Sequence, residues 1–163
     1  MPRIEVTTEV DAPAADVFDL SRSIDAHQAT QTTHQERAVG GRTSGLIALN
    51  EEVTWEASHF GVRQKLTSKI VAMDHPHHFR DSLVRGAFKR FDHDHFFETT
   101  TSKTTLMKDV FDYTSPLGFL GQIADSIFLK SYMRRLLEER NRMIKQIAES
   151  GDSGKYLPDQ PTH

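Results

Sequence analysis

The chain begins with an alternating pattern of apolar and polar residues. In RIEVTTEV, from Arg3 to Val10, isoleucine and valine alternate with glutamate and threonine. Successive side chains of a strand point to opposite faces of a sheet, so this pattern predicts a half-buried strand. The next residues, DAPAADVFDL, place aspartate and proline where a helix would begin, and a second short helix is expected from about Ser23 to Thr30. The chain therefore opens with one strand and two short helices.

Strand-forming segments and short turns dominate the middle of the chain. The first segment runs from about Thr33 to Val39, followed by EEVTWEASHF, VRQKLTSKIVAM, HFRDSLVRG, AFKRFDHDHFFET and TTLMKDVFDY. Turn-forming pieces such as GGRTSG and DHPH separate them. Connections of hairpin length join neighbouring strands in antiparallel order, so we expect six further strands in an antiparallel meander.

The pattern changes period beyond Pro116. Apolar residues recur there at steps of three and four, which is typical of an amphipathic helix. We expect one helix from Pro116 to about Ser150, about 50 Å long at 1.5 Å per residue, with its apolar stripe on the concave face of the meander. Residues 1–150 are therefore expected to form a single domain. The remaining residues, 151–163, are polar and contain glycine and proline, which predicts a disordered tail.

Composition and charge narrow the class of protein. The 163 residues include no cysteine, which excludes disulfides, thiolate metal sites and cysteine nucleophiles. The net charge is −3 with both signs interspersed, so we expect no binding to nucleic acid. The densest basic stretch, MRRLLEER, has helical spacing and is expected to be a solvated helix face. No apolar run is long enough for a membrane span, so we expect a soluble, cytoplasmic protein without stable membrane insertion.

Four segments of the chain are similar to a known superfamily. They are VDAPAADVFDL, GLIALNEEVTWEASHFG, HPHHFRDSLVRGAFKRFDHDHFFE and TLMKDVFDYTSPLGFLG, in this order. The sequence resembles the START-like, Bet v 1-like superfamily, and within it the bacterial polyketide cyclase/dehydrase-type SRPBCC ligand-binding proteins. The resemblance implies an α+β helix-grip fold, in which a curved antiparallel seven-stranded sheet wraps around the C-terminal helix. It also implies a cavity for a lipid, polyketide, quinone or aromatic molecule, but no fixed reaction and no cofactor.

Strand periodicity predicts which side chains face such a cavity. On the last strand, the set that starts with Met107 is expected to point inward, because the alternate set carries the more solvated charges. Phe91 and Phe96 are expected to face outward. Apolar walls with a few polar groups are typical of a small-molecule site. The side chains expected to contact the ligand are Trp55, His59, Asp81, His93, His95, Phe97, Met107, Asp109, Phe111 and Tyr113.

The stretch RFDHDHFFE allows three interpretations. Its histidines, His93 and His95, are two residues apart and so share one face of a strand. They could be metal ligands, part of the pocket wall, or structural residues hydrogen-bonded to Asp81 and Asp109. With Glu98 the spacing is similar to the first metal motif of cupins, but Glu98 falls on the other face and a cupin would end in strands. A two-histidine, one-carboxylate site with Asp81 or Asp109 stays open. We favour an organic-ligand pocket without a metal, in which at least one histidine offers an unpaired donor or acceptor to the ligand.

Binding of an apolar small molecule is therefore the favoured function. One alternative is an enzyme of the cyclase or dehydratase type, in which His93, His95, Asp109 and Tyr113 are the candidate acids and bases. Another is a protein-interaction module whose interior is packed core without a ligand. Hydrolase, NTPase and dinucleotide-binding functions have no support, because the sequence has no G-x-S-x-G, Walker-type or G-x-G-x-x-G motif.

Overall fold

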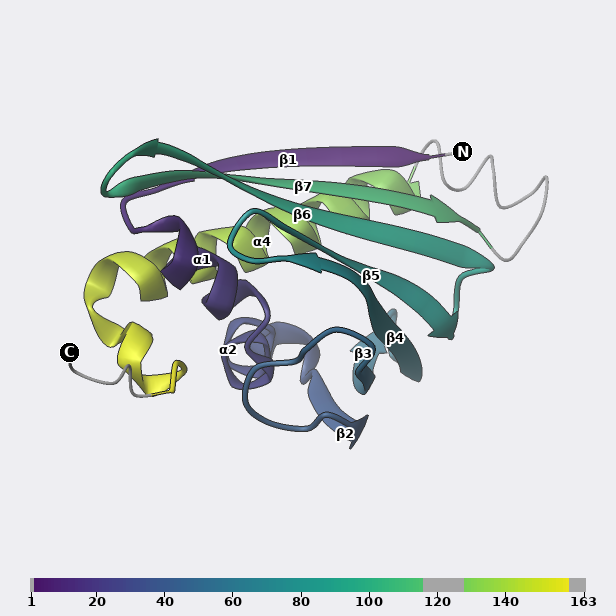
Figure 1. The fold of residues 1–163 in the computed structure, drawn as a ribbon. Coiled ribbons are helices and arrows are strands. Elements are labelled where there is room, and N and C mark those ends of the chain that lie inside the picture. Colours follow the sequence, from purple (N-terminus) through teal and green to yellow (C-terminus); the bar gives the residue numbers. More distant parts are fainter. Residues whose placement is uncertain (1, 116–127, 159–163) are drawn as a thin grey trace.

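A seven-stranded antiparallel sheet curves around a C-terminal helix in the computed structural model, which describes residues 2–115 and 128–158 (Figure 1). The strand order is β1-β7-β6-β5-β4-β3-β2. This arrangement confirms the predicted helix-grip fold. The elements are β1 (Arg3–Val10), α1 (Ala14–Ser21), α2 (Ile24–Thr30), η1 (Thr32–His34), β2 (Arg37–Gly41), β3 (Glu52–His59), β4 (Val62–Asp74), β5 (His78–Arg85), β6 (Arg90–Thr101), β7 (Thr104–Thr114), α4 (Lys130–Ser150) and η3 (Asp152–Lys155).

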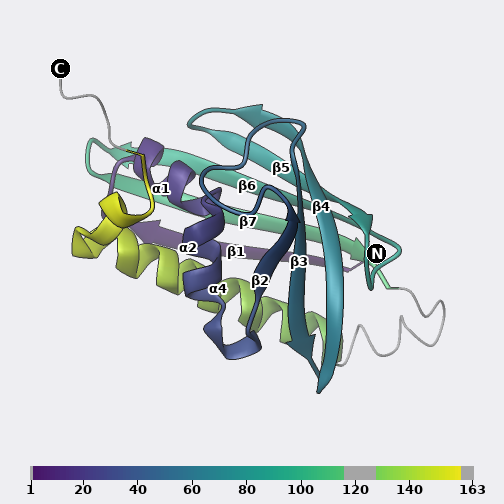
Figure 2. The ribbon, with the colours of Figure 1, turned by 90° about the horizontal axis from the view of Figure 1, so that it is seen from below.

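The sheet has one concave side, and the helices occupy it. Seen from below, α4 runs along this side while α1 and α2 cover one end (Figure 2). The pairing of β4 with β5 shifts register at Thr67/Ser68 and again at Ile70/Ala72. Such irregularities bend a strand and increase its twist, and here both lie along β4. The β3–β4 connection is a two-residue turn in which Phe60 and Gly61 both have positive φ, of 53° and 73°. That conformation matches the right-handed twist of the paired strands.

Apolar side chains form two clusters on the concave side. The first joins Val17 and Phe18 of α1 to Phe97, Met107 and Ile144. The second contains buried side chains of β1, β6, β7 and α4, namely Ile4, Val6, Phe91, Phe111, Tyr113 and Leu137. The two clusters fix α1 and α4 against the sheet, because each helix places its apolar stripe on inward-facing strand residues.

Three expectations differ from the structure or lie outside the part it describes. Phe91 was expected to face outward, but it is buried, because it has the same strand parity as His93. Within the segment expected as a strand from Thr33, the 3-10 helix η1 comes first and pairing starts only at Arg37. The helix expected from Pro116 is described from Lys130 onward, and residues 116–127 are outside the described ranges.

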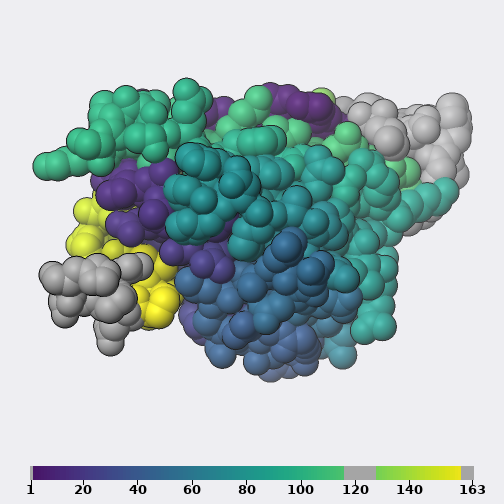
Figure 3. Space-filling model, in the orientation of Figure 1, coloured from purple at the N-terminus to yellow at the C-terminus, as the bar shows by residue number. Residues whose placement is uncertain are grey.

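Residues 151–158, the described part of the tail that was expected to be disordered, have a defined structure. A left-handed Gly151 ends α4, and η3 follows. Tyr156 and Leu157 then pack against the first cluster, which supplies the apolar contacts that a polar tail would lack. Figure 3 shows this yellow segment beside the purple residues of α1. Across 2–115 and 128–158, no helix combines the length and apolar character needed to cross a bilayer.

Candidate functional site

A cavity of about 590 Å³ lies between the sheet and α4. Its wall comes from α2, from strands β3 to β7 and from α4, so it is bounded by both layers of the fold. Most of the side chains on it are apolar. They include Ile24, Ile47, Val53, Trp55, Leu66, Ile70, Phe79, Phe88, Phe91, Phe111, Leu129, Met133, Leu136 and Leu137.

The structure brings six of the ten predicted contact residues to this cavity. These six are Trp55, His59, Asp81, His93, His95 and Phe111. The other four predicted residues point inward but lie behind the cavity wall. Phe97 and Met107 are covered by α1, where Phe97 lies 5.2 Å from the Phe18 ring and the Met107 sulfur lies 3.7 Å from Ser21 Oγ.

Asp109 and Tyr113 are the other two residues behind the wall, and both have zero exposure. The ring of Tyr113 packs against Phe88 and Phe111, with centroids 5.5 Å away in each case. Of the four candidate acids and bases, only His93 and His95 therefore reach the cavity. Their catalytic roles stay predictions.

Asp109 is the centre of a buried polar network. His93 Nε2 lies 2.9 Å from Asp109 Oδ1, and the Asn141 amide donates to Oδ2. The Arg140 guanidinium lies 3.5 Å from the same carboxylate. Burial acts to raise the pKa of Asp109, but the two histidines and Arg140 outweigh it and hold that pKa well below its usual value. Asp109 is therefore an anion whose charge is compensated inside the protein.

His95 lies between two carboxylates. Its Nε2 is 3.0 Å from Asp81 Oδ1 and its Nδ1 is 2.8 Å from Asp109 Oδ1. The second contact is too poorly aligned for a hydrogen bond, so we treat it as a close charge contact. Burial acts to lower the pKa of His95, but the contacts with Asp109 and Asp81 outweigh burial and raise it. Both nitrogens of His95 thus face protein carboxylates.

One ring nitrogen of His93 is hydrogen-bonded within the protein and the other is not. Its Nε2 faces Asp109, whereas its Nδ1 lies 3.7 Å from Asp81 Oδ1, beyond hydrogen-bond range. Burial and the charge of His95 lower the pKa of His93, which favours a neutral imidazole. Of the pair, His93 is therefore the ring that could offer a nitrogen to a bound molecule, and its role in ligand binding stays a prediction.

Arg140 is a site residue that the sequence analysis missed. The stretch MRRLLEER was expected to be solvated, but Arg140 is buried and lines the cavity. Its guanidinium donates to Asn141 Oδ1 at 3.1 Å and to the carbonyl of Ser21 at 3.0 Å. The available signal was its position three residues after Leu137 and four before Ile144, on the apolar stripe of the helix.

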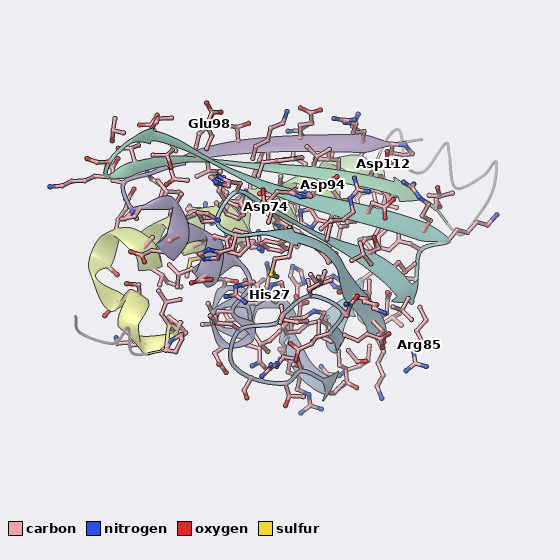
Figure 4. The ribbon with its side chains drawn as sticks, in the orientation of Figure 1. His27, Asp74, Arg85, Asp94, Glu98 and Asp112 are labelled. Atoms are coloured by element: carbon pink, nitrogen blue, oxygen red, sulfur yellow. The ribbon has the colours of Figure 1, made fainter. Side chains whose placement is uncertain are left out.

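A second polar group lines the cavity near β2 and β3. His27, on the helix side of the sheet (Figure 4), contacts Glu36 at 3.1 Å and lies with its ring 4.3 Å from Trp55. Nearby, His59 Nδ1 lies 2.8 Å from the Tyr132 hydroxyl. Burial raises the pKa of Glu36, but the charges of its histidine neighbours, His27 foremost, outweigh burial and lower it. His27 and Glu36 were missed because neither belongs to a segment with clear strand alternation.

Comparisons with known proteins bear on the fold. No protein-family model matches the sequence, and a comparison with curated protein sequences finds no match. Solved structures do match. A protein from Thermus thermophilus superposes with a TM-score of 0.75 at 13% identity, over 92% of this chain and 99% of that one.

Two further solved structures match over similar lengths. A START superfamily protein from Mycobacterium smegmatis has a TM-score of 0.69 at 13% identity, over 91% of this chain and 97% of that one. Norcoclaurine synthase from Thalictrum flavum, in complex with dopamine and hydroxybenzaldehyde, has a TM-score of 0.64 at 13% identity, over 91% and 87% of the two chains. The chain has the START-like, Bet v 1-like SRPBCC fold.

Proposed function

We propose that this protein binds an apolar small molecule, of the lipid, polyketide, quinone or aromatic type, in the cavity between the sheet and α4. The observation that carries the proposal is a cavity of about 590 Å³ with largely apolar walls between the two layers of a small chain. Pockets for small organic molecules usually measure about 300 to 1,000 Å³ and combine apolar walls with a few placed polar groups. This cavity has both properties.

The aromatic side chains favour a ligand with a flat ring system. Trp55, Phe88, Phe91 and Phe111 all lie on the wall. Aromatic rings pack well against one another in offset or edge-to-face arrangements, which adds to the free energy of area burial. One structural neighbour, norcoclaurine synthase, was solved with two small aromatic molecules, which supports the same class for this chain.

The polar groups on the wall would fix the ligand's orientation. His93 lies at one position on the wall, and His59 with Tyr132 lies at another. Because Nε2 of the neutral His93 ring donates to Asp109, Nδ1 is an acceptor, and a ligand hydroxyl that donated to it would add one hydrogen bond, worth about 0.5 to 1.5 kcal/mol. The walls therefore supply affinity and the few polar groups supply selectivity.

Native mass spectrometry of the protein, purified without denaturation, tests the proposal. We expect a population whose mass exceeds that of the chain by one apolar molecule, which organic extraction then releases. A chain that carries no molecule, and that binds none from an added set of lipids, quinones and aromatic polyketides, would contradict the proposal and favour the interaction-module alternative.

A further inference from the structure

We propose that Asp81, His93 and His95 form a site for one divalent transition-metal ion, such as Zn²⁺, in the wall of the cavity. One nitrogen of each histidine and one oxygen of Asp81 all lie within 4.8 Å of one another. Two imidazoles and a carboxylate are a suitable donor set for zinc and for neighbouring first-row metals. This inference does not depend on the organic ligand and would stand if the cavity bound none.

The three proposed ligand atoms are Asp81 Oδ1, His95 Nε2 and His93 Nδ1. Asp81 Oδ1 lies 3.0 Å from His95 Nε2 and 3.7 Å from His93 Nδ1. Ligand-to-metal distances at such sites are about 2.0 to 2.2 Å, so ligand atoms around one ion lie roughly 3 to 4 Å apart. The two separations measured from Asp81 are already of this size. Small side-chain rotations would bring the three atoms around one ion, which would replace the proton between Asp81 and His95.

The contacts of the two remaining histidine nitrogens are the stronger evidence for a metal site. The other nitrogens, His93 Nε2 and His95 Nδ1, lie 2.9 Å and 2.8 Å from the same oxygen of Asp109. A histidine that ligates a metal almost always donates its remaining N–H to a carboxylate, carbonyl or water. His93 Nε2 makes this hydrogen bond to Asp109, and His95 Nδ1 lies in close contact with the same oxygen without the alignment of a hydrogen bond. Each ring therefore has Asp81 on one side and Asp109 on the other. Asp109 has zero exposure, and Asn141 holds its second oxygen, so it is fixed in this supporting position.

Charge and access also suit a cation. Arg140 lies beside Asp109, 3.5 Å from its carboxylate, and so compensates that buried charge. The proposed ligand carboxylate, that of Asp81, forms its close ion pairs with the two histidines, and the Asp81 side chain retains 18% exposure. All three proposed ligands line the cavity. An ion held by three protein ligands would therefore keep an open position toward the cavity, where water or a ligand oxygen could bind.

Titration of chelator-treated protein with Zn²⁺ and Co²⁺ tests the site. We expect one equivalent of either ion per chain by calorimetry. X-ray absorption of the cobalt protein should show nitrogen and oxygen ligands that include two imidazoles. Asp81→Asn and His93→Asn should each weaken zinc binding at least about tenfold, or 1.4 kcal/mol.

The opposite face of the same strands supplies matched controls. There His78 Nε2 lies 2.7 Å from Asp94 Oδ1, a histidine–carboxylate pair of similar geometry. Asp94→Asn and His78→Asn should leave zinc binding unchanged. Failure of the wild-type protein to bind a stoichiometric ion, or equal affinity in the Asp81→Asn and Asp94→Asn variants, would overturn the proposal. The X-ray absorption of the wild-type protein decides the question even if a variant does not fold.

Discussion

His93 and His95 lie two positions apart on β6, and yet their surroundings differ. His95 has a carboxylate at each nitrogen and stacks on Phe79 with ring centroids 4.1 Å apart. His93 lines the cavity, and its Nδ1 has no hydrogen bond to the described part of the chain. We infer that His95 is the more tightly held of the two rings, whereas His93 has a nitrogen that makes no hydrogen bond to a described residue.

The first prediction concerns His95→Phe. The phenyl ring would keep the stacking on Phe79, but the Asp81 carboxylate would lose the imidazole hydrogen-bonded to it, while Asp109 keeps His93, Asn141 and Arg140. Breaking a buried pair by removing one member costs about 3 to 5 kcal/mol, because a charge is left without compensation. We expect a loss of that size in the free energy of unfolding, measured by urea denaturation in the presence of a chelator.

His78→Phe is the matched control for that substitution. His78 also stacks on a phenylalanine, Phe96, at 4.7 Å and also faces a carboxylate, that of Asp94. Asp94 keeps two contacts of 2.8 Å with Arg80, so the loss should be about 1 kcal/mol or less. Equal losses in the two variants would mean that the Asp81–His95–Asp109 arrangement adds nothing specific.

The second prediction concerns the pH dependence of stability at His59. The pKa of His59 is lowered, mainly by burial and secondly by the charge of His34, while the charge of Glu36 acts to raise it. The folded state therefore takes up a proton at lower pH than the unfolded state, whose pKa is about 6.5. The contribution of His59 is unaffected above that pH and falls as the pH drops from about 6.5 toward the folded pKa.

His59→Gln should reduce this loss, since glutamine does not titrate and can still bond the Tyr132 hydroxyl. Thermal unfolding of both proteins between about pH 7.5 and 5 measures this loss of stability. Because the pKa of His59 is lowered in the folded state, the stability of the wild-type protein should fall more steeply with decreasing pH than that of His59→Gln. Parallel curves for the two proteins would show that the pKa of His59 is the same in the folded and unfolded states.

At the scale of the elements, strand periodicity predicted the sheet well. β1 has the expected bounds, and β3 to β7 fall within a few residues of theirs. All ten predicted site residues point to the concave side, because period-2 alternation determines the face. Alternation does not determine what covers a residue on that face. Phe97 and Met107 meet α1, whereas His93 and Phe111 meet the cavity, and only the packed helices decide between these outcomes.

Polar residues on an apolar stripe were the main signal that the sequence analysis did not use. Arg140 and Asn141 lie between Leu137 and Ile144 on the buried side of α4. Helical spacing alone indicated that something on this stripe would be buried. It could not indicate the partner, because Asp109 comes from a strand 31 residues earlier than Arg140 and meets it only in the folded protein.

The third prediction distinguishes core from cavity wall along α4. Ile144 has 2% exposure in the first cluster, so Ile144→Ala should destabilise the protein by about 2 to 5 kcal/mol. Leu136 is half-buried on the cavity wall. Leu136→Ala enlarges a space that already exists and should cost clearly less. Chemical denaturation of both variants measures the difference, and a larger loss for Leu136→Ala would mean that the cavity is closed by packing in solution.

At the scale of the whole molecule, the residues that the structure describes leave a cavity between the sheet and α4. Lining a cavity of about 590 Å³ with apolar side chains forgoes dispersion contacts that a packed core would have. A ligand that fills this space restores those contacts and stabilises the folded state, by an amount that grows with the logarithm of its affinity. The sheet, α4 and the polar groups on the wall together therefore form one binding unit.

The most direct test of ligand binding is the affinity of a variant whose cavity is partly filled. Ala57 is buried on β3 and lines the cavity, so Ala57→Leu places extra volume where the ligand would lie. Ala72→Leu, on β4 and outside the cavity wall, is the matched control. The quantity to measure is the dissociation constant of the co-purified molecule, or of an apolar fluorescent dye that it displaces. We predict that Ala57→Leu stays folded and binds at least about tenfold more weakly than wild type, with Ala72→Leu unchanged. Equal affinities in all three folded proteins would contradict a ligand site between the sheet and α4.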